Sequence, residues 1–591
     1  LHYAENDPII GRIKAAGIYN QNGDDVKIIF VPSYLNGADG VFNMQYYDLL
    51  IGFDLTVFPS YYEPWGYTPL ESLAFHIPTI TTSLAGFGLW ARDNYKDPGN
   101  GIFVINRDDY NNQEVVDAIS EAIKIVDKLT PKAVRESRDK AFDISRIALW
   151  SNLIDYYYNA FDIALTKVME RVDTFVEHER VEQLPQLDLN LGATPVWKRV
   201  LVQQILPESL QGLEELSRNL WWCWNQDAIE LFESIDPKLW KVTAENPIEL
   251  LELIPFDRLD NLQKDEAFLN RLNAVYGRFK SYMAEKPKEG PTVGYFSMEF
   301  GLHDSLKIYS GGLGLLAGDY LKEASDYNYK VIGIGFLYRY GYFKQLMSVA
   351  GEQLSVSEKQ IFSKTPAQPV YDESGEHKKI KIVLPGRDLI ARIWEVNVGR
   401  VKLYLLDADI DENQEHDRSI THQLYGGNNE NRLKQEILLG IGGIRALRAL
   451  GLNPDIYHCN EGHAAFIGLE RLRELIQNNN RTYPEALEIV RSSSLFTTHT
   501  PVPAGHDYFS EDLMRAYIAH YPIRLKITWN QLMNLGKMHP NSGSEKFSMS
   551  CLAVNLSQEV NGVSRLHGKV SREMFADMWS GYLTEEIPIG H

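Results

Sequence analysis

Short apolar runs alternate with turn residues and helical stretches along the first 110 residues of the chain. Four of these runs have the length and composition of buried strands. They are Val26–Val31, Leu55–Pro59, Thr79–Thr82 and Ile102–Ile105. Buried strands separated by helices are typical of an α/β layer built on a parallel sheet.

The pattern becomes helical at Asn112 and stays so to about Glu182, with apolar residues three and four positions apart. The segment Glu177–Thr194 mixes charges, contains a proline and a glycine, and has no clear period. It is predicted to be a linker that overlaps the end of the last helix.

A second helical region runs from residue 206 to about 286 and holds Trp221, Trp222 and Trp224 close together. These rings could stack against sugars, but packing in a core is the commoner role of tryptophan on a helix. A second α/β region follows the turn-rich segment Pro287–Pro291. Its predicted strands include Thr292–Phe296, Lys330–Ile334, Lys402–Leu406, Asp455–His458 and Ser494–Thr498.

Composition narrows the functional class. The 591 residues allow three or four domains, and 44% apolar with 23% charged residues is a globular composition. The net charge of −20 argues against nucleic-acid binding, and three cysteines are too few for a disulfide framework or a four-cysteine zinc site. No apolar run has the length of a membrane span. A reducing, cytoplasmic setting is expected, and the composition of both ends suggests a fragment of a longer protein.

The most informative stretch is Val57–Glu71, where a strand is predicted to end near Ser60 and a helix to begin near Thr68. Thr68 would be the N-cap, with Pro69 at the first helical position and Glu71 completing a capping box. This capping role alone would explain the presence of a glutamate at position 71.

The same geometry also suits an anion. A helix N-terminus beyond the carboxyl end of a strand offers free N–H groups at the edge where α/β sheets bind ligands. A carboxylate at Glu63, eight residues before Glu71, could hold sugar hydroxyls or stabilise positive charge, although a plain solvated glutamate is the simpler interpretation. A nucleotide-sugar diphosphate meets all of these requirements.

Residues 8–95, which include Tyr61–Pro69 and Thr81–Gly88, resemble the C-terminal half of the animal and fungal type of glycogen synthase. The resemblance implies transfer of glucose, with retention, from a UDP-glucose donor to an α-1,4-glucan. It also implies that Glu63 is catalytic, beside the donor glucose. The donor-binding residues implied are Gly66, Tyr67 and Thr68, whose backbone would face the diphosphate, and Glu71, near the ribose hydroxyls.

The segment Tyr309–Asp319 is a glycine-rich loop that opens a helix. Close backbone approach to a phosphate or a sugar is one interpretation, and a purely structural turn is another. A dinucleotide-binding loop is disfavoured because the spacing is not G-x-G-x-x-G.

Three further segments lie where strands are predicted to end. Asp455–His463 mixes potential metal ligands, but it lacks the H-E-x-x-H spacing, so a polar loop facing a cleft is favoured and no metal site is predicted. His499 ends another apolar strand, where a lone histidine is more often structural. Val560–His567 alone reads as a turn between two elements.

Together these four segments resemble the N-terminal domain of the α-glucan phosphorylases over residues 292–591, and residues 206–286 resemble the leader of the shorter bacterial branch. The resemblance implies cleavage of an α-1,4-glucan by inorganic phosphate with pyridoxal phosphate as cofactor, its anchoring lysine expected outside this chain. His499 would be catalytic, hydrogen-bonding the glucose at the cleavage point. The glucan- and phosphate-binding residues implied are Gly311, Gly312, Leu313, Gly314, Glu461, His463 and Val563, with Val563 on the cofactor side.

The sequence therefore predicts an α/β chain that joins Rossmann-like halves of two GT-B glycosyltransferases through a helical region. The domains expected are a synthase half (1–180), a linker (181–205), a helical leader (206–286) and a phosphorylase half (287–591). Each half would lack one wall of its cleft, so little activity is expected of this chain by itself. A non-catalytic glucan-binding or scaffolding protein is the alternative, and a dehydrogenase is a distant third. Neither a nucleic acid nor a membrane is expected as a partner.

Overall fold

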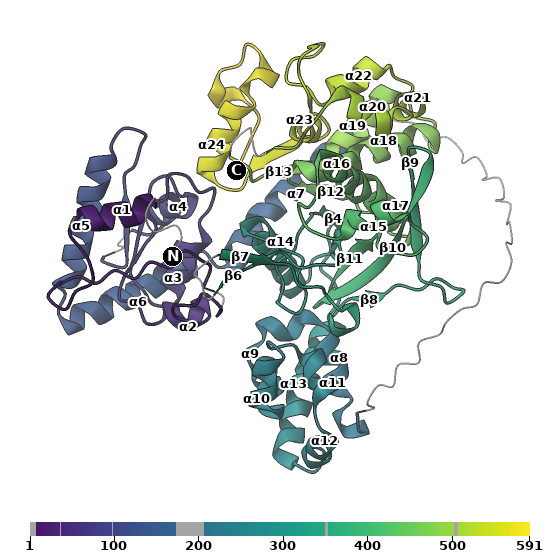
Figure 1. Ribbon diagram of the computed structural model, residues 1–591. Coiled ribbons are helices and arrows are strands. Elements are labelled where there is room, and N and C mark those ends of the chain that lie inside the picture. Colours follow the sequence, from purple (N-terminus) through teal and green to yellow (C-terminus); the bar gives the residue numbers. More distant parts are fainter. Residues whose placement is uncertain (1–6, 36, 97–98, 173–205, 349–352, 502–505) are drawn as a thin grey trace. The chain divides into compact units, whose positions relative to one another are not determined.

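The computed structural model describes residues 7–35, 37–96, 99–172, 206–348, 353–501 and 506–591 (Figure 1). The chain divides into two compact units, one of residues 1–148 and 340–359 and the other of residues 149–339 and 360–591. This division differs from the predicted domains, because the helix after residue 149 groups with the second unit. The predicted linker, 181–205, lies outside the described residues.

The first unit contains a parallel sheet in the order β1-β2-β3, and its second and third strands have the predicted bounds. Ile80 of β2 packs with Val115 and Ala122 of α5. The helices and strands of the first unit are α1 (Pro8–Ala15), α2 (Tyr46–Leu50), β1 (Thr56–Val57), α3 (Tyr67–Ala74), β2 (Thr79–Thr82), α4 (Gly86–Asn94), β3 (Ile102–Ile105), α5 (Asn112–Asp127), α6 (Pro131–Ile147), and the antiparallel pair β6 (Lys344–Met347) and β7 (Gln353–Val356).

The predicted strand at Val26–Val31 is wrong, because these residues are irregular. Val26 is 57% exposed and Ile29 is 62% exposed, so the apolar run is not buried against the sheet. Apolar composition predicts a strand only where a neighbouring strand supplies hydrogen-bond partners.

The helical region predicted from residue 206 is confirmed. Trp221 and Trp222 are buried on a short 3₁₀ helix, Leu220–Trp224, and the Trp222 ring lies 5.8 Å from that of Trp240. Core packing is therefore the role of these two residues. The helices are α8 (Gly212–Arg218), α9 (Gln226–Ile235), α10 (Pro237–Val242), α11 (Pro247–Leu253), α12 (Phe256–Leu262) and α13 (Glu266–Ala284).

The described residues of the second unit form a mixed sheet in the order β16-β13-β12-β4-β5-β11-β10-β8, with β9 also paired to β10. The strands from β16 to β11 are parallel, and β10 pairs antiparallel with β11, β9 and β8. The strands are β4 (Val293–Phe296), β5 (Val331–Phe336), β8 (Gln368–Pro369), β9 (Lys379–Leu384), β10 (Arg387–Val398), β11 (Val401–Asp407), β12 (Ile456–Asn460), β13 (Ser494–Thr498) and β16 (Glu559–Gly562).

Helices cover both faces of this sheet. Gly333 of β5 approaches Leu321 of α14, and the next residue, Ile334, approaches Gly443 of α17. Successive residues of a strand point to opposite faces, so α14 and α17 lie on opposite faces. The helices are α7 (Trp150–Val172), α14 (Gly312–Asp326), α15 (Glu415–Arg418), α16 (Asn429–Ile437), α17 (Gly443–Ala449), α18 (Phe466–Gln477), α19 (Tyr483–Ser492), α20 (Glu511–Ile518), α21 (Tyr521–Leu525), α22 (Trp529–Asn534), α23 (Met549–Asn555) and α24 (Arg565–Met574), and a small pair β14 (Tyr508–Phe509) and β15 (Phe547–Ser548) stands apart.

The predicted α/β class is confirmed, and the five strands predicted after residue 291 all exist. The antiparallel strands β8, β9 and β10 are absent from the prediction. In β9 the exposed Lys379 and Lys381 interrupt the buried apolar residues, so its continuous apolar run is limited to residues 382–384. The turn predicted at Val560–His567 is wrong in part, because Val560 to Gly562 extend β16 and α24 begins at Arg565. Across the described helices, none combines the length and apolar character that a bilayer span requires.

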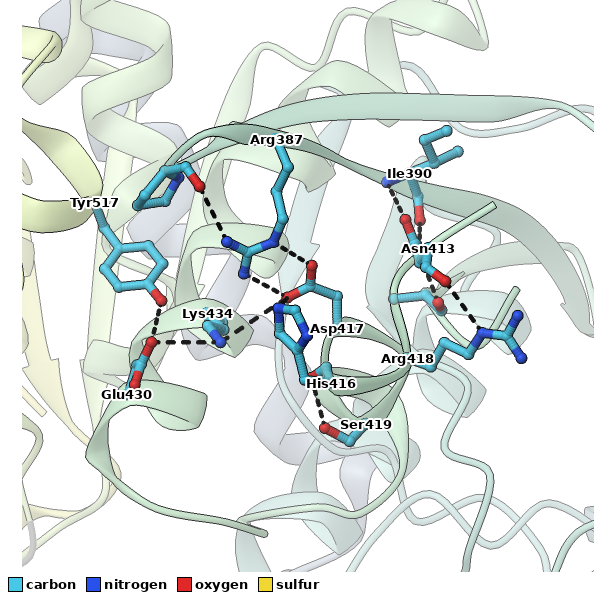
Figure 2. Close-up of polar contacts among 12 residues, drawn as sticks. Arg387, Ile390, Asn413, His416, Asp417, Arg418, Ser419, Glu430, Lys434 and Tyr517 are labelled. Atoms are coloured by element: carbon cyan, nitrogen blue, oxygen red, sulfur yellow. Dashed lines mark hydrogen bonds and ion pairs between the residues drawn. The ribbon is translucent and has the colours of Figure 1, made fainter. Parts of the chain in front are cut away.

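An ion-pair cluster ties α15 and α16 to β10 (Figure 2). Arg387 donates through Nη2 to Asp417 Oδ1 at 2.8 Å, and Asp417 is 1% exposed. Lys434 Nζ lies 3.9 Å from the same oxygen and 3.5 Å from Glu430 Oε1, which also accepts from Tyr517. Burial raises the pKa of Asp417, but Arg387 outweighs it, so the pKa lies below its usual value.

Replacing Asp417 with alanine is expected to destabilise the second unit by about 3 kcal/mol, because Arg387 and Lys434 would lose their buried counterion. Urea unfolding measures this loss. Asp411→Ala is the matched control: Asp411 also pairs with an arginine, Arg418, at 2.9 Å, but it is 98% exposed and should contribute no measurable stability. Equal midpoints for the two variants would contradict the prediction.

Candidate functional site

The candidate residues of the second unit follow the carboxyl ends of neighbouring parallel strands. Met298 and Glu299 follow β4, Glu461 follows β12, His499 follows β13 and Val563 follows β16. Ligands of open α/β sheets bind at this edge. Hydrogen bonds connect the ends of β4, β12 and β13 to one another and to the start of α14.

Glu461 joins the ends of β12 and β13. Its Oε2 accepts from the backbone N–H of His499 at 2.8 Å, and from the N–H and the hydroxyl of Thr500 at 2.9 and 3.0 Å. Its Oε1 accepts from the N–H of Gly462 at 2.9 Å. Both oxygens of this buried carboxylate therefore face hydrogen-bond donors.

The backbone of Glu461 is strained, with φ +73° and ψ 160°, a region almost confined to glycine. Such strain tends to occur at functional sites. Burial raises the pKa of Glu461, but His499, His506 and the backbone donors outweigh it and lower the pKa to about 2. The group is an anion at neutral pH.

The imidazole of His499 is a partly buried, neutral ring. Its Nε2 lies 2.7 Å from Oδ1 of Asn460, the last residue of β12. Burial lowers the pKa of His499 to about 4, although Glu461 opposes the shift. His499 thus carries a satisfied hydrogen bond, as a structural histidine does, and sits at the strand-end edge, as a sugar-binding histidine would.

His463 connects β12 to β4. Its Nε2 accepts from the backbone N–H of Met298 at 3.1 Å, so the proton of the neutral ring resides on Nδ1. Burial lowers its pKa to about 4. Arg432 lies next to it, with Nη1 3.4 Å from the sulfur of Met298 and Nη2 2.6 Å from Asp507 Oδ2, so a paired cation borders the site.

The predicted glycine-rich loop opens α14, with Gly311 as the N-cap. Glu299, buried at 2% exposure, accepts through Oε2 from the N–H of Ser310 at 2.8 Å and from that of Gly311 at 3.4 Å, and its Oε1 accepts from Tyr425 Oη at 2.5 Å. A Cβ at position 314 would lie 2.7 Å from Glu299 Oε2, so Gly314 is required for this packing. Gly311 and Gly312 are exposed, and Leu313 is half-buried.

Several residues of this cluster are absent from the sequence prediction. Asn460 stands inside the noted Asp455–His463 segment and could have been found there. The others lie in stretches whose composition is unremarkable, and their contacts bridge distant segments. They are Met298, Glu299, Tyr425, Arg432, His506 and Asp507.

In the first unit, Glu63 forms an isolated parallel bridge with Ala85, the N-cap residue of α4. Its Oε2 accepts from the hydroxyl of Ser60 at 3.2 Å. Burial raises its pKa despite that hydrogen bond. Gly66 is close by, since a Cβ there would lie 3.5 Å from Glu63 Oε2, and its φ of +112° favours glycine.

The predicted capping box at Thr68 is wrong. Helix α3 begins at Tyr67 with Gly66 as its N-cap and no side-chain cap, because the left-handed turn at Gly66 starts the helix earlier. Thr68 is exposed within the first turn. Glu71 instead accepts from Tyr47 Oη at 2.9 Å, so it is not a capping residue.

Arg107 follows β3, at the carboxyl edge of the first unit's sheet. It is a cation that the sequence prediction missed. It is 8% exposed, its guanidinium lies 3.4 Å from the centre of the Tyr61 ring, and Nη1 donates to the carbonyl of Pro59 at 2.7 Å. Within the described residues, no group of three or more His, Cys, Asp and Glu side chains is arranged to hold a metal ion.

Comparison with known proteins gives three family matches along the chain. Residues 2–191 match the glycogen synthase family, residues 206–306 match a family of unknown function (DUF3417), and residues 449–587 match the carbohydrate phosphorylase family.

Individual relatives match the larger part of the chain. A maltodextrin phosphorylase of Thermococcus litoralis is 42% identical over 396 residues, which cover 66% of this chain and 47% of the relative. A glycogen phosphorylase of Mycobacterium tuberculosis is 40% identical over 66% of this chain and 48% of its own length. A glycogen phosphorylase of Aquifex aeolicus is 39% identical over 64% and 55%. The chain thus spans about half the length of the relatives it matches.

Proposed function

We propose that this chain, which joins a glycogen synthase segment to a carbohydrate phosphorylase segment, belongs to a bifunctional hexosyltransferase of α-1,4-glucan metabolism. One part would transfer glucose from UDP-glucose to the glucan, with retention. The other would cleave the glucan with inorganic phosphate to release glucose 1-phosphate. The observation that carries the proposal is the convergence of Glu461, His499, His463 and the start of α14 at one sheet edge.

In the phosphorylase segment the chemistry of the cluster suits a neutral sugar. Glu461 is an anion, and both of its carboxylate oxygens already accept hydrogen bonds from backbone N–H groups. Its role would therefore be to hold the backbone of His499 and Thr500 in place. His499, held by Asn460, would then present a neutral ring to a glucose hydroxyl. His463 would border the same sugar.

The N-terminus of α14 fits a phosphate. The N–H groups of Gly312 and Leu313 precede the first intrahelical hydrogen bond, from Gly314 to Gly311, and the helix dipole favours an anion there. Exposed glycines would let a phosphate approach the backbone closely. Pyridoxal phosphate, when bound to the whole protein, would supply a phosphate group for acid–base chemistry, and Val563 would line that side of the pocket.

In the synthase segment the proposal places the donor at the start of α3. The backbone of Gly66, Tyr67 and Thr68 would face the diphosphate, and the exposed position of Thr68 is compatible with that. Glu63, with its raised pKa, would lie beside the donor glucose, and Glu71 beside the ribose.

UDP binding measured by calorimetry tests the synthase site. The chain is expected to bind UDP, and Glu71→Ala is expected to weaken binding roughly tenfold, the usual effect of a lost charge-assisted hydrogen bond. Tyr47→Phe is the matched control, because it removes the Tyr47–Glu71 hydrogen bond and leaves the carboxylate in place. Absence of UDP binding by the folded chain, or equal affinities for both variants, would overturn this assignment.

Glucan binding separates the proposal from a non-catalytic scaffold. Retardation of the chain in glycogen-containing native gels is expected to fall on His499→Ala. Retardation that survives both Glu63→Ala and His499→Ala would instead favour a glucan-binding surface elsewhere on the chain.

A further inference from the structure

Helix α7 packs against the rest of the second unit through an aromatic face. Tyr157 stacks on Tyr320 of α14 with ring centres 4.9 Å apart, and Tyr158 stacks on Tyr329 at 4.3 Å. Ile154 and Phe161 are fully buried, whereas Tyr156 is 64% exposed and Ile163 is 48% exposed. The buried positions recur at the spacing of one helix face.

The surface that receives α7 is formed by strands that carry the candidate site. Tyr295 of β4 and His458 of β12 are register partners, and both are buried. The ring of Tyr295 lies 4.8 Å from that of Tyr320. The His458 ring lies 6.0 Å from both Tyr157 and Phe161 of α7.

His458 links this surface to the edge of the sheet. Its Nε2 lies 2.8 Å from the hydroxyl of Thr497 on β13, and that hydroxyl lies 2.8 Å from Asn561 Oδ1 on β16. Two residues beyond His458, β12 ends at Asn460, which holds His499. The helix therefore packs against β12 and β13, the strands that lead to Asn460 and His499, and the Thr497–Asn561 hydrogen bond connects these strands to β16.

We infer that α7, although it lies within the residues that match glycogen synthase, is a structural helix of the phosphorylase part and holds β12 and β13 in place. The surface it covers is an interface for this segment of the chain, built from tyrosine and histidine rings. The glycogen synthase match ends at residue 191, after the start of α7, whereas the first segment of the first folded unit ends at residue 148, before α7. The family boundary and the boundary of the folded unit therefore differ. This inference is independent of the reaction proposed above.

Amide hydrogen exchange on the whole chain tests the inference. The double substitution Tyr157→Ala with Phe161→Ala is expected to raise exchange in β12 and β13 at least tenfold, since it removes two rings packed on the sheet. The matched control is Tyr156→Ala with Ile163→Ala, which removes a tyrosine and an aliphatic residue from the exposed face of the same helix. It should leave exchange in both strands unchanged.

Equal exchange in β12 and β13 for the two double variants would overturn the inference. Ile154→Val keeps the test decisive if the buried double variant does not fold, because it deletes one methylene from the same face. It should raise exchange in β12 and β13 by roughly fivefold. Unchanged exchange in Ile154→Val would likewise count against a supporting role for α7.

Discussion

Replacing Glu461 with glutamine is expected to destabilise the second unit by about 3 kcal/mol at neutral pH. The amide has one acceptor oxygen, so it cannot accept from His499, Thr500 and Gly462 at once, and its NH₂ group would face a backbone donor. Urea unfolding followed by tryptophan fluorescence measures the loss.

The same residue predicts a pH dependence. The pKa of Glu461 falls from an ordinary 4.5 to about 2 in the folded chain. Its contribution is therefore complete above about pH 4.5 and is lost as the pH falls toward 2, a change of about 3 kcal/mol. The Glu461→Gln variant should lack this acid-sensitive component.

Glu252→Gln is the control for both measurements, because Glu252 is exposed on α11. It should retain the midpoint and the acid profile of the unsubstituted chain. If Glu461→Gln also retained the unfolding midpoint and the acid profile, the hydrogen bonds of the Glu461 carboxylate would not stabilise the second unit as predicted.

Replacing Gly318 with alanine is expected to cost about 4 kcal/mol or to prevent folding of the second unit. A Cβ at this position would lie 1.9 Å from the carbonyl oxygen of Gly301, and backbone atoms cannot yield as a flexible side chain does. Gly301 also donates to the carbonyl of Gly314 at 2.7 Å, so α14 and the segment after β4 meet backbone to backbone.

Gly277→Ala is the matched control, since Gly277 also lies within a helix, α13, but has no atom within 4 Å of the position its Cβ would take. Alanine there should stabilise the chain by about 0.5–1 kcal/mol through helix propensity. Thermal melting distinguishes the two variants, which should shift in opposite directions. A tolerated Gly318→Ala would contradict the close approach of α14.

The candidate sites were predictable where the chemistry is local in sequence. The glycine-rich loop opens a helix as predicted, with Gly311 as the N-cap of α14. Glycine is a poor helix former, however, and Gly314 is required there by its close approach to Glu299, which the sequence alone does not reveal. The predicted cap at Thr68 failed because the neighbouring Gly66 can adopt a φ of +112°, which starts α3 earlier. Which of two nearby residues, Gly66 or Thr68, caps the helix depends on backbone geometry that composition does not reveal.

The sequence by itself determined the α/β class, the parallel strands with continuous apolar runs, the buried tryptophans and the two family motifs. Each of these rests on periodicity or on residues close together in the chain. Only the tertiary structure decided that His463 accepts from Met298, 165 positions away, and that α7 packs on β12. The same holds for Glu461, whose carboxylate accepts from the N–H groups of His499 and Thr500, the residues that follow β13. Such contacts join segments whose approach is set by the packing of the whole sheet, and no local pattern encodes them.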